Sequence, residues 1–252
     1  MTIDSVQRFS TKAHLYARYR WEFAPASIDA LVRIAGLRRN ALVADIGSGT
    51  GALCLPLLRA GMRVLGIEPN AEMRQLAEDQ LAGFSTFTSI DALSNATGLA
   101  DGSVELVTVG RALHWLPAES TRREFRRILA SGGWLAILGV SCSDEALTAA
   151  TRGIQREVYG WDVAGGKVSQ PEIPFSFYFG GGHFQDLHFP ASVLETWTEF
   201  FGRLLSISSA PDPGSELHPR FESAARAIFD QFSVNGSLTI PLSTDLSIGQ
   251  VL

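Results

Sequence analysis

The stretch that most constrains the fold is residues 41–51, an apolar, β-branched run that ends in glycines at 47, 49 and 51. An apolar segment, residues 52–60, follows it. A strand, a glycine turn and a helix in this order open a parallel α/β sheet. Alternating glycines let a ligand approach the backbone closely, and the helix beyond offers free N–H groups. The pattern therefore indicates a site for a nucleoside.

The glycine spacing alone leaves the class of nucleoside open. Gly47, Gly49 and Ala52 satisfy the relaxed dinucleotide pattern G-x-G-x-x-G/A, so an NAD-dependent oxidoreductase remains an alternative. Asp45 disfavours it, because dinucleotide-binding folds normally carry an apolar residue two positions before the first glycine. We expect this carboxylate to point into the turn. It could also tie down the glycine loop through backbone amides.

Two motifs carry a more specific similarity. The pattern hydrophobic-x-D-x-G-x-G-x-G within residues 41–51 resembles motif I of class I S-adenosylmethionine-dependent methyltransferases. Residues 97–109 (TGLADGSVELVTV), followed by Ala-Leu-His-Trp at 112–115, resemble a small-molecule subgroup of which trans-aconitate methyltransferase is a relative. The resemblance is strong over residues 41–140 and looser beyond them.

This resemblance implies a fold and an organisation. The fold would be α/β and doubly wound (Rossmann-like), with a mostly parallel seven-stranded sheet in the order 3-2-1-4-5-7-6 and strand 7 antiparallel. Residues 1–252 would form a single domain: an N-terminal lid and first helix (1–40), a cofactor-binding half (41–140) and a substrate-side half (141–252). The cofactor would be S-adenosyl-L-methionine and the methyl acceptor a small molecule.

The resemblance also implies the residues of the cofactor site. Glu68 ends an expected strand at residues 63–68, where a carboxylate can accept both ribose hydroxyls, although it could instead cap a helix. Met73 would lie under the adenine or in the core. Tyr16 and Arg20 match positions near the methionine end of the cofactor, or belong to a docking helix. The full set is Tyr16, Arg20, Asp45, Gly47, Ser48, Gly49, Gly51, Glu68, Pro69, Met73, Asp91, Leu93, Ser94, Gly110, Arg111 and Ala112.

The sequence departs from the subgroup at the adenine contact. An Asp-Ala-Glu normally precedes Thr-Gly-Leu there, and the Asp holds the adenine amino group. This chain has Leu93, Ser94 and Asn95 at those positions, and the nearest acid is Asp91. Either Asp91 takes over the contact, or the backbone at Leu93 and Ser94 makes it alone.

His114 is the candidate catalytic residue. It follows a central strand, where this fold places the methyl group and its acceptor, and an imidazole is suited to deprotonating an acceptor near neutral pH. The adjacent Trp115 equally suits a packed corner with a structural histidine. We see no metal-ligand spacing and no nucleophile–histidine–acid constellation. A further alternative is a protein that binds the cofactor but methylates nothing.

Periodicity gives coarser expectations for the other elements. Four arginines of one helix, Arg122, Arg123, Arg126 and Arg127, are expected on a solvated face. The aromatic stretch from Tyr159 to Phe184 would select the acceptor together with the N-terminal leader, the segment before the helix at 24–36. Residues 175–184 would be either a lid or a loop anchored by buried rings. We expect strands at 84–91, 104–110, 134–140, 183–189, 238–240 and 245–251, and helices at 24–36, 71–81, 120–130, 193–205 and 221–232.

Composition bounds the partners. A formal net charge of −5 gives no basic surplus for binding nucleic acid. No apolar run approaches the length of a membrane span, and residues 1–10 lack a signal pattern. Cys54 and Cys142 have no metal or redox spacing, which suits a reducing compartment. We expect a cytoplasmic protein, a monomer or homodimer, with no nucleic-acid or membrane partner.

Overall fold

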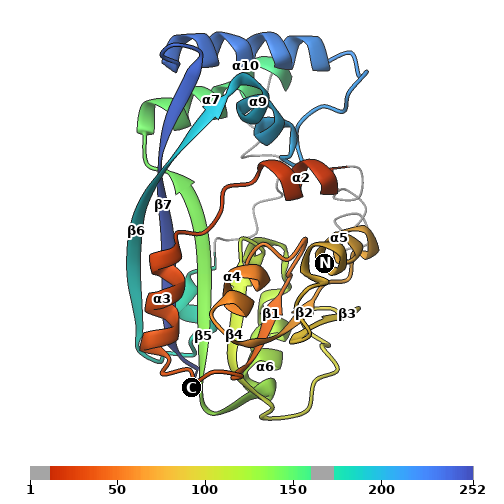
Figure 1. The fold of residues 1–252 in the computed structure, drawn as a ribbon, viewed down its shortest axis with the longest axis vertical. Helices are drawn as coiled ribbons and strands as arrows, with labels where there is room; N and C mark the ends of the chain where they lie inside the picture. The colour runs from red at the N-terminus through yellow and green to blue at the C-terminus, as the bar shows by residue number, and fades with distance from the viewer. Residues whose placement is uncertain (1–11, 160–172, 252) are drawn as a thin grey trace.

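A computed structural model describes residues 12–159 and 173–251. Its centre is a seven-stranded sheet in the order β3-β2-β1-β4-β5-β7-β6 (Figure 1). β7 runs antiparallel to both of its neighbours, and the other neighbouring strands pair in parallel. The expected fold class and strand order are confirmed. The strands are β1 (Leu42–Ile46), β2 (Arg63–Ile67), β3 (Phe87–Ile90), β4 (Val104–Gly110), β5 (Leu129–Cys142), β6 (Phe184–Thr196) and β7 (Ser237–Gln250).

Helices cover both faces of the sheet, and the two central parallel strands, β1 and β4, are largely buried. One core cluster joins α3 (Pro25–Ile34), α4 (Cys54–Arg59) and the end of α5 (Ala71–Leu81) to one face. A second cluster joins α6 (Ala118–Ile128) and α8 (Phe175–Tyr178) to the other face.

A third apolar cluster lies beyond the parallel part of the sheet. β5, β6 and β7 continue upward in Figure 1 and carry helices at their far end. Phe200, Phe221 and Phe229 are buried there with Ile240 of β7. α2 (Ala13–Tyr19) lies between this upper part and the rest of the molecule. The upper helices are α7 (Glu145–Tyr159), α9 (Trp197–Leu205) and α10 (His218–Phe232).

Local chemistry explains where the helices begin. Asn70 caps α5, because its Oδ1 accepts the Met73 N–H at 2.9 Å. Pro56 falls in the first turn of α4, where a missing N–H breaks no helical hydrogen bond. Thr196 and Glu199 form a capping box that starts α9 at Trp197. The expected helix start at residue 193 is therefore wrong.

The last two strands are longer than expected. Residues 193–196 belong to β6, and the two expected terminal segments are one strand, β7, that runs through Pro241. Pro241 is tolerated because it lies one residue beyond the last pair of the β5–β7 ladder, which joins Cys142 to Leu242. β5 also begins at Leu129, earlier than the expected residue 134. Among the described residues, no helix has the length and apolarity to cross a bilayer.

Candidate functional site

The glycine turn after β1 has a backbone that only glycine adopts comfortably. Gly47, Gly49 and Gly51 have φ angles of 69°, 55° and 83°. A Cβ on Gly47 would lie 2.6 Å from the Cβ of Ala112, and one on Gly51 would lie 2.8 Å from Leu81. The turn is thus held tightly against the segment after β4 and against α5. It lies at the carboxyl ends of the strands, where open α/β sheets bind ligands.

Glu68, directly after β2, holds the glycine turn in place. It is 5 % exposed, and its Oε2 accepts the Gly49 N–H at 3.1 Å while Oε1 accepts the Asn70 N–H at 2.9 Å. Each oxygen has a second lone pair for a ligand hydroxyl. Burial raises the pKa of Glu68, and the two backbone hydrogen bonds oppose this effect. The cap of the following helix is Asn70 and not Glu68.

Asp45 occupies a different position from the one expected. Its carboxylate is buried, with Oδ1 accepting from the Thr108 hydroxyl at 2.8 Å and Oδ2 from the Cys54 thiol at 3.2 Å. Burial raises the pKa of Asp45 to about 6, and these hydrogen bonds lower it. Asp45 therefore links β1 to β4 and α4. Asp45 was expected to point into the glycine turn or to bind its backbone amides, but the N–H of Gly49 in this turn binds Glu68 instead.

A cavity of about 620 Å³ opens beside Glu68, at the carboxyl ends of β2 and β3. It brings together Pro69, Asp91 and Leu93, three residues of the expected cofactor set. Residues 96–99 form its opposite wall. Ser94 does not line it, because its hydroxyl is buried against the Thr121 hydroxyl of α6 at 2.9 Å.

The two expected adenine contacts remain alternatives in this geometry. Asp91 lines the cavity, and its carboxylate accepts from Arg74 at 2.9 Å. It would therefore have to bind the adenine while it is also paired with the Arg74 guanidinium. Leu93 is 41 % exposed, and its carbonyl accepts the Ala96 N–H. Met73 is buried at 4 % exposure in α5, as a core residue would be.

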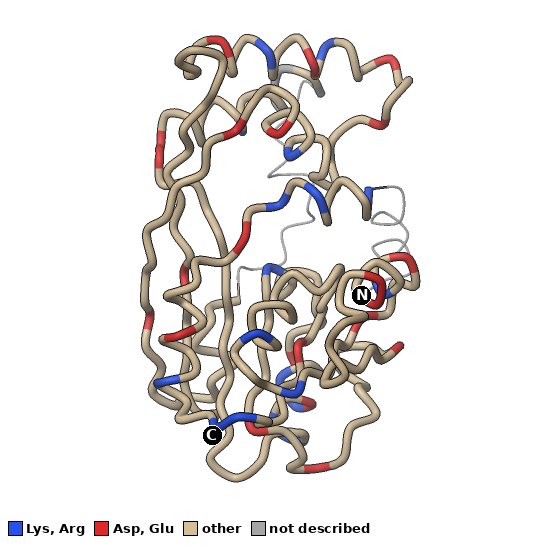
Figure 2. Tube along the Cα trace, in the orientation of Figure 1, with Lys and Arg blue, Asp and Glu red and all other residues tan. Residues whose placement is uncertain are grey.

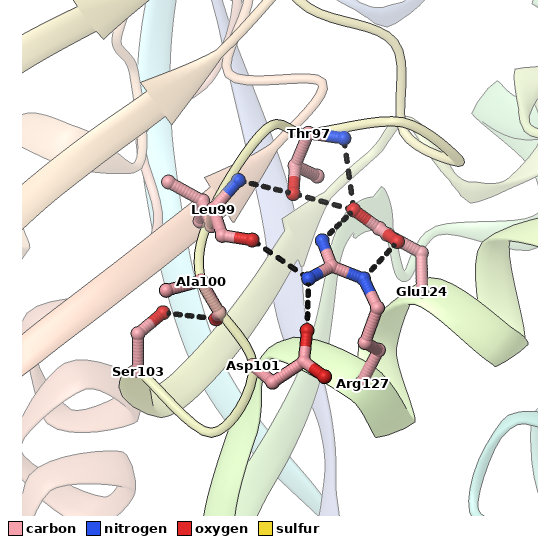
Figure 3. Close-up of polar contacts among 7 residues, drawn as sticks. All are labelled: Thr97, Leu99, Ala100, Asp101, Ser103, Glu124 and Arg127. Atoms are coloured by element: carbon pink, nitrogen blue, oxygen red, sulfur yellow. Dashed lines mark hydrogen bonds and ion pairs between the residues drawn. The ribbon is translucent and has the colours of Figure 1, made fainter.

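A network between α6 and the cavity wall was not expected from the sequence (Figure 3). Glu124 accepts from the N–H and the hydroxyl of Thr97, at 2.9 and 2.6 Å, and from Arg127. Arg127 also donates to the Leu99 carbonyl and to Asp101. The expectation of a solvated face is wrong for two of the four arginines: Arg127 holds a loop, and Arg122 lies 4.8 Å above the Phe177 ring with a buried Nε. The run of four arginines does not show which of them have such contacts.

The segment after β4 binds the leader. Arg111 has a φ of 58°, donates to the Trp21 carbonyl at 2.9 Å and lies 4.6 Å above the Phe23 ring. A Cβ on Gly110 would lie 3.2 Å from the same ring, which explains a small residue there. Arg111, expected at the cofactor, therefore has a structural partner in the leader.

α2 presents Tyr16 and Arg20 together, with the Arg20 guanidinium 4.9 Å above the Tyr16 ring. The Nε of Arg20 is buried and has no hydrogen-bond partner among the described residues. Burial lowers the pKa of Arg20, and the charges of Arg111 and Arg203 lower it further. Basic positions recur along α2 and the segment after it (Figure 2). An anionic ligand group would satisfy this donor.

Trp21 connects the leader to the upper part of the molecule. No local sequence pattern predicts its partners. Its Nε1 donates to Glu195 at 2.7 Å, and Glu195 also accepts from Arg203 at 2.8 Å. Both charged residues are buried. Tyr19 packs directly on Gly202 of α9, where a Cβ would lie 2.6 Å from the ring. The leader thus touches both halves of the chain.

His114 lies on the short 3₁₀ helix η1 (Leu113–Trp115) after β4, and its side chain is exposed. Its ring centroid is 5.0 Å from that of Trp115. The exposure argues against a packed corner. In the aromatic stretch, Tyr178 and Phe179 are buried in the core, which favours an anchored loop over a lid. Phe9, the Tyr159 side chain and Trp161 lie outside the described residues.

Comparison with known proteins bears on the class of nucleotide-binding protein. Residues 44–137 match the family described as a methyltransferase domain. The match runs from β1 into β5 and includes the glycine turn, Glu68 and the cavity.

Similar proteins extend the comparison. An uncharacterized methyltransferase of Mycobacterium tuberculosis is 30% identical over 135 residues, 54% of this chain and 53% of that protein. Another from Bacillus subtilis is 43% identical over 67 residues, 27% of this chain and 30% of that protein. The first match thus spans about half the length of the relative.

Solved structures show the same fold over nearly the whole chain. A proposed type II methyltransferase from Anaeromyxobacter dehalogenans has a TM-score of 0.66 at 20% identity, covering 93% of this chain and 99% of that one. The YcgJ protein of Bacillus subtilis has a TM-score of 0.56 at 17% identity, covering 91% and 100%. At these identities the likeness establishes the methyltransferase fold.

Proposed function

We propose that this protein transfers a methyl group from S-adenosyl-L-methionine to a small-molecule acceptor. The observation that carries the proposal is the arrangement around Glu68: a buried carboxylate that holds the glycine turn at Gly49 and directly precedes Pro69, which lines the cavity at the ends of β2 and β3. The methyltransferase domain match covers the same residues.

The residues present fit the parts of this cofactor. The free lone pairs of the buried Glu68 carboxylate suit ribose hydroxyls. The cavity lined by Pro69, Asp91 and Leu93 suits an adenine. The buried Nε of Arg20, close to Tyr16, suits the carboxylate of a methionine moiety. Ser48, Gly47, Gly51, Gly110 and Ala112 would contribute backbone surface around the turn.

When bound, the cofactor supplies a methyl group that is already activated on a sulfonium. The protein then has mainly to orient the donor and the acceptor and to exclude water, and orientation by itself can contribute several kcal/mol. We assign the orientation of the nucleoside to the glycine turn and Glu68. Arg20 and Tyr16 of α2 would orient the methionine end.

His114 would act as a base if the acceptor must lose a proton, because it is exposed after β4 and an imidazole is a suitable general base. His114→Ala should then lower kcat by about 10²- to 10⁴-fold and leave cofactor affinity unchanged. Turnover within a few-fold of wild type in a folded, cofactor-binding variant would make His114 a structural residue.

Isothermal titration calorimetry tests the cofactor. We expect S-adenosylhomocysteine to bind the wild-type protein with one-to-one stoichiometry and NAD not to bind. Glu68→Ala should weaken binding by roughly 1.5–3 kcal/mol, the usual worth of a hydrogen bond to a charged group. Binding of NAD alone would overturn the assignment, and an unchanged affinity would limit Glu68 to holding the turn.

The acceptor is found by incubating the protein with methyl-labelled S-adenosylmethionine and fractionated small-molecule extract. A labelled product would identify it and show whether oxygen, nitrogen or carbon is methylated. Stoichiometric binding without transfer to any fraction would favour a protein that binds the cofactor and methylates nothing. We further infer one domain, a monomer or homodimer, in the cytoplasm, where the free thiols Cys54 and Cys142 would stay reduced.

A further inference from the structure

One wall of the cavity beside Glu68 is a loop, residues 96–99, that lies between β3 and β4. The loop belongs to none of the strands of the sheet. Two residues of α6 spaced three apart, Glu124 and Arg127, bind it (Figure 3). Thr121, three residues before Glu124, binds Ser94 just before the loop. This spacing places all three side chains on the same side of the helix.

The contacts fix the backbone of the wall and not only its side chains. Glu124 Oε1 accepts the Thr97 N–H at 2.9 Å, and Arg127 donates to the Leu99 carbonyl at 2.7 Å. Thr97 is 1 % exposed and Glu124 is 7 % exposed, so water competes little for the bond between them, whereas the Arg127 side chain is 35 % exposed. The two ends of the wall are therefore tied to two charged side chains.

The two charged side chains also hold each other. Arg127 donates from Nε and Nη2 to both oxygens of Glu124, at 2.9 and 2.7 Å. A paired guanidinium and carboxylate have few alternative rotamers, which makes them a rigid support. Gly98 lies between the two tied residues with a φ of 74°, and a Cβ there would meet nothing within 4 Å, so the loop is open at that point.

We propose that Glu124 and Arg127 are positioning residues that set the affinity of the adenosine part of the cofactor by fixing the cavity wall at residues 97–99. They bind residues 97 and 99 of the wall, and they do not line the cavity themselves. The proposal rests on the proposed function, because it requires that an adenosine moiety occupies this cavity.

The test variant is Glu124→Gln, which keeps the size of the side chain and one acceptor oxygen for Thr97. Its amide nitrogen would replace Oε2 and face the Arg127 Nε–H, and the negative charge would be lost, so the pairing with Arg127 is weakened. We expect the dissociation constants of S-adenosylhomocysteine and of 5′-methylthioadenosine to rise by the same factor, about 2- to 30-fold, as for other residues coupled to a ligand through contacts. 5′-Methylthioadenosine lacks the amino-acid end, so it reports on the adenosine part.

Hydrogen exchange separates positioning from general destabilisation. In Glu124→Gln, exchange of the amides of residues 93–101 should accelerate, while the amides of β1 and β4 should keep wild-type protection. Thr97→Val removes the hydroxyl that donates to Glu124 and accepts from the Leu99 N–H, and it keeps the Thr97 N–H bond to Glu124. It should produce a smaller change in the same direction, and it serves as the test if Glu124→Gln fails to fold. Asp230→Asn, which removes a carboxylate from the exposed Arg226–Asp230 pair of α10, is the matched control and should leave both affinities unchanged.

Three results would overturn the proposal. One is a wild-type affinity for both ligands in Glu124→Gln and Thr97→Val, and another is a loss for S-adenosylhomocysteine alone. The third is accelerated exchange along the whole chain. If wild-type protein binds neither ligand, the proposed function itself fails, and that result is distinguishable because it needs no variant.

Discussion

At the scale of single residues, the site combines buried carboxylates whose environments act in opposite directions. Arg127 and Thr97 surround Glu124 with donors, and these hold its pKa at about 2. Asp45 has two neutral donors and no cation, so burial dominates and its pKa rises to about 6. Ionised Glu124 therefore stabilises the fold, and ionised Asp45 destabilises it.

The pH dependence of Asp45→Asn follows from this difference. The pKa of Asp45 is raised in the folded protein from its usual 3.8 to about 6, so its ionisation destabilises the fold progressively between about pH 4 and 6 and by a constant amount above. Asparagine keeps an acceptor for Thr108 without a charge. Relative to wild type, the Tm of the variant should rise between pH 4 and 6 and then level off.

The gain above pH 6 is at most about 3 kcal/mol, the value of two pKa units. Thermal unfolding followed by circular dichroism from pH 4 to 8 measures it. Asp230→Asn, at an exposed carboxylate, is the control and should show no such rise. A constant difference between Asp45→Asn and wild type at every pH would contradict the prediction.

At the scale of elements, the leader joins two parts of the chain through Trp21. Its carbonyl accepts from Arg111 after β4, and its indole N–H donates to Glu195 of β6. Arg203 of α9 lies 4.3 Å above the same ring. The position of Arg20, one residue earlier, depends on these contacts.

Trp21→Phe should loosen the leader without unfolding the protein. Phenylalanine keeps the ring under Arg203 and the backbone bond to Arg111, but it removes the N–H that binds the Glu195 carboxylate. Hydrogen exchange of residues 12–24 should accelerate, and S-adenosylhomocysteine affinity should fall by about 2- to 30-fold through Arg20. Unchanged exchange in this segment would show that the indole bond does not hold it.

At the scale of the whole molecule, the sequence predicted the elements that have a periodic pattern of apolar residues. Periodicity located the parallel strands, and the resemblance supplied the strand order that the structure confirms. The end of β6 was missed because its half-exposed residues alternate weakly, and the middle of β7 was missed because Pro241 interrupts the strand pattern. Glu195 and Arg203 were missed because a buried ion pair has no local pattern. Its two halves become partners only when β6 and α9 pack.

The three long strands have a consequence for the size of the acceptor. β5, β7 and β6 pass without interruption from the sheet beneath the site to the helices above it, so their length sets the height of those helices over the glycine turn (Figure 1). An antiparallel strand gains about 3.4 Å per residue. Two further residues in each strand would move these helices roughly 7 Å farther from the glycine turn, and every side chain would keep its face of the sheet. A change in the length of these strands would thus let a protein of this architecture admit a larger acceptor while the sheet and the glycine turn stay unchanged.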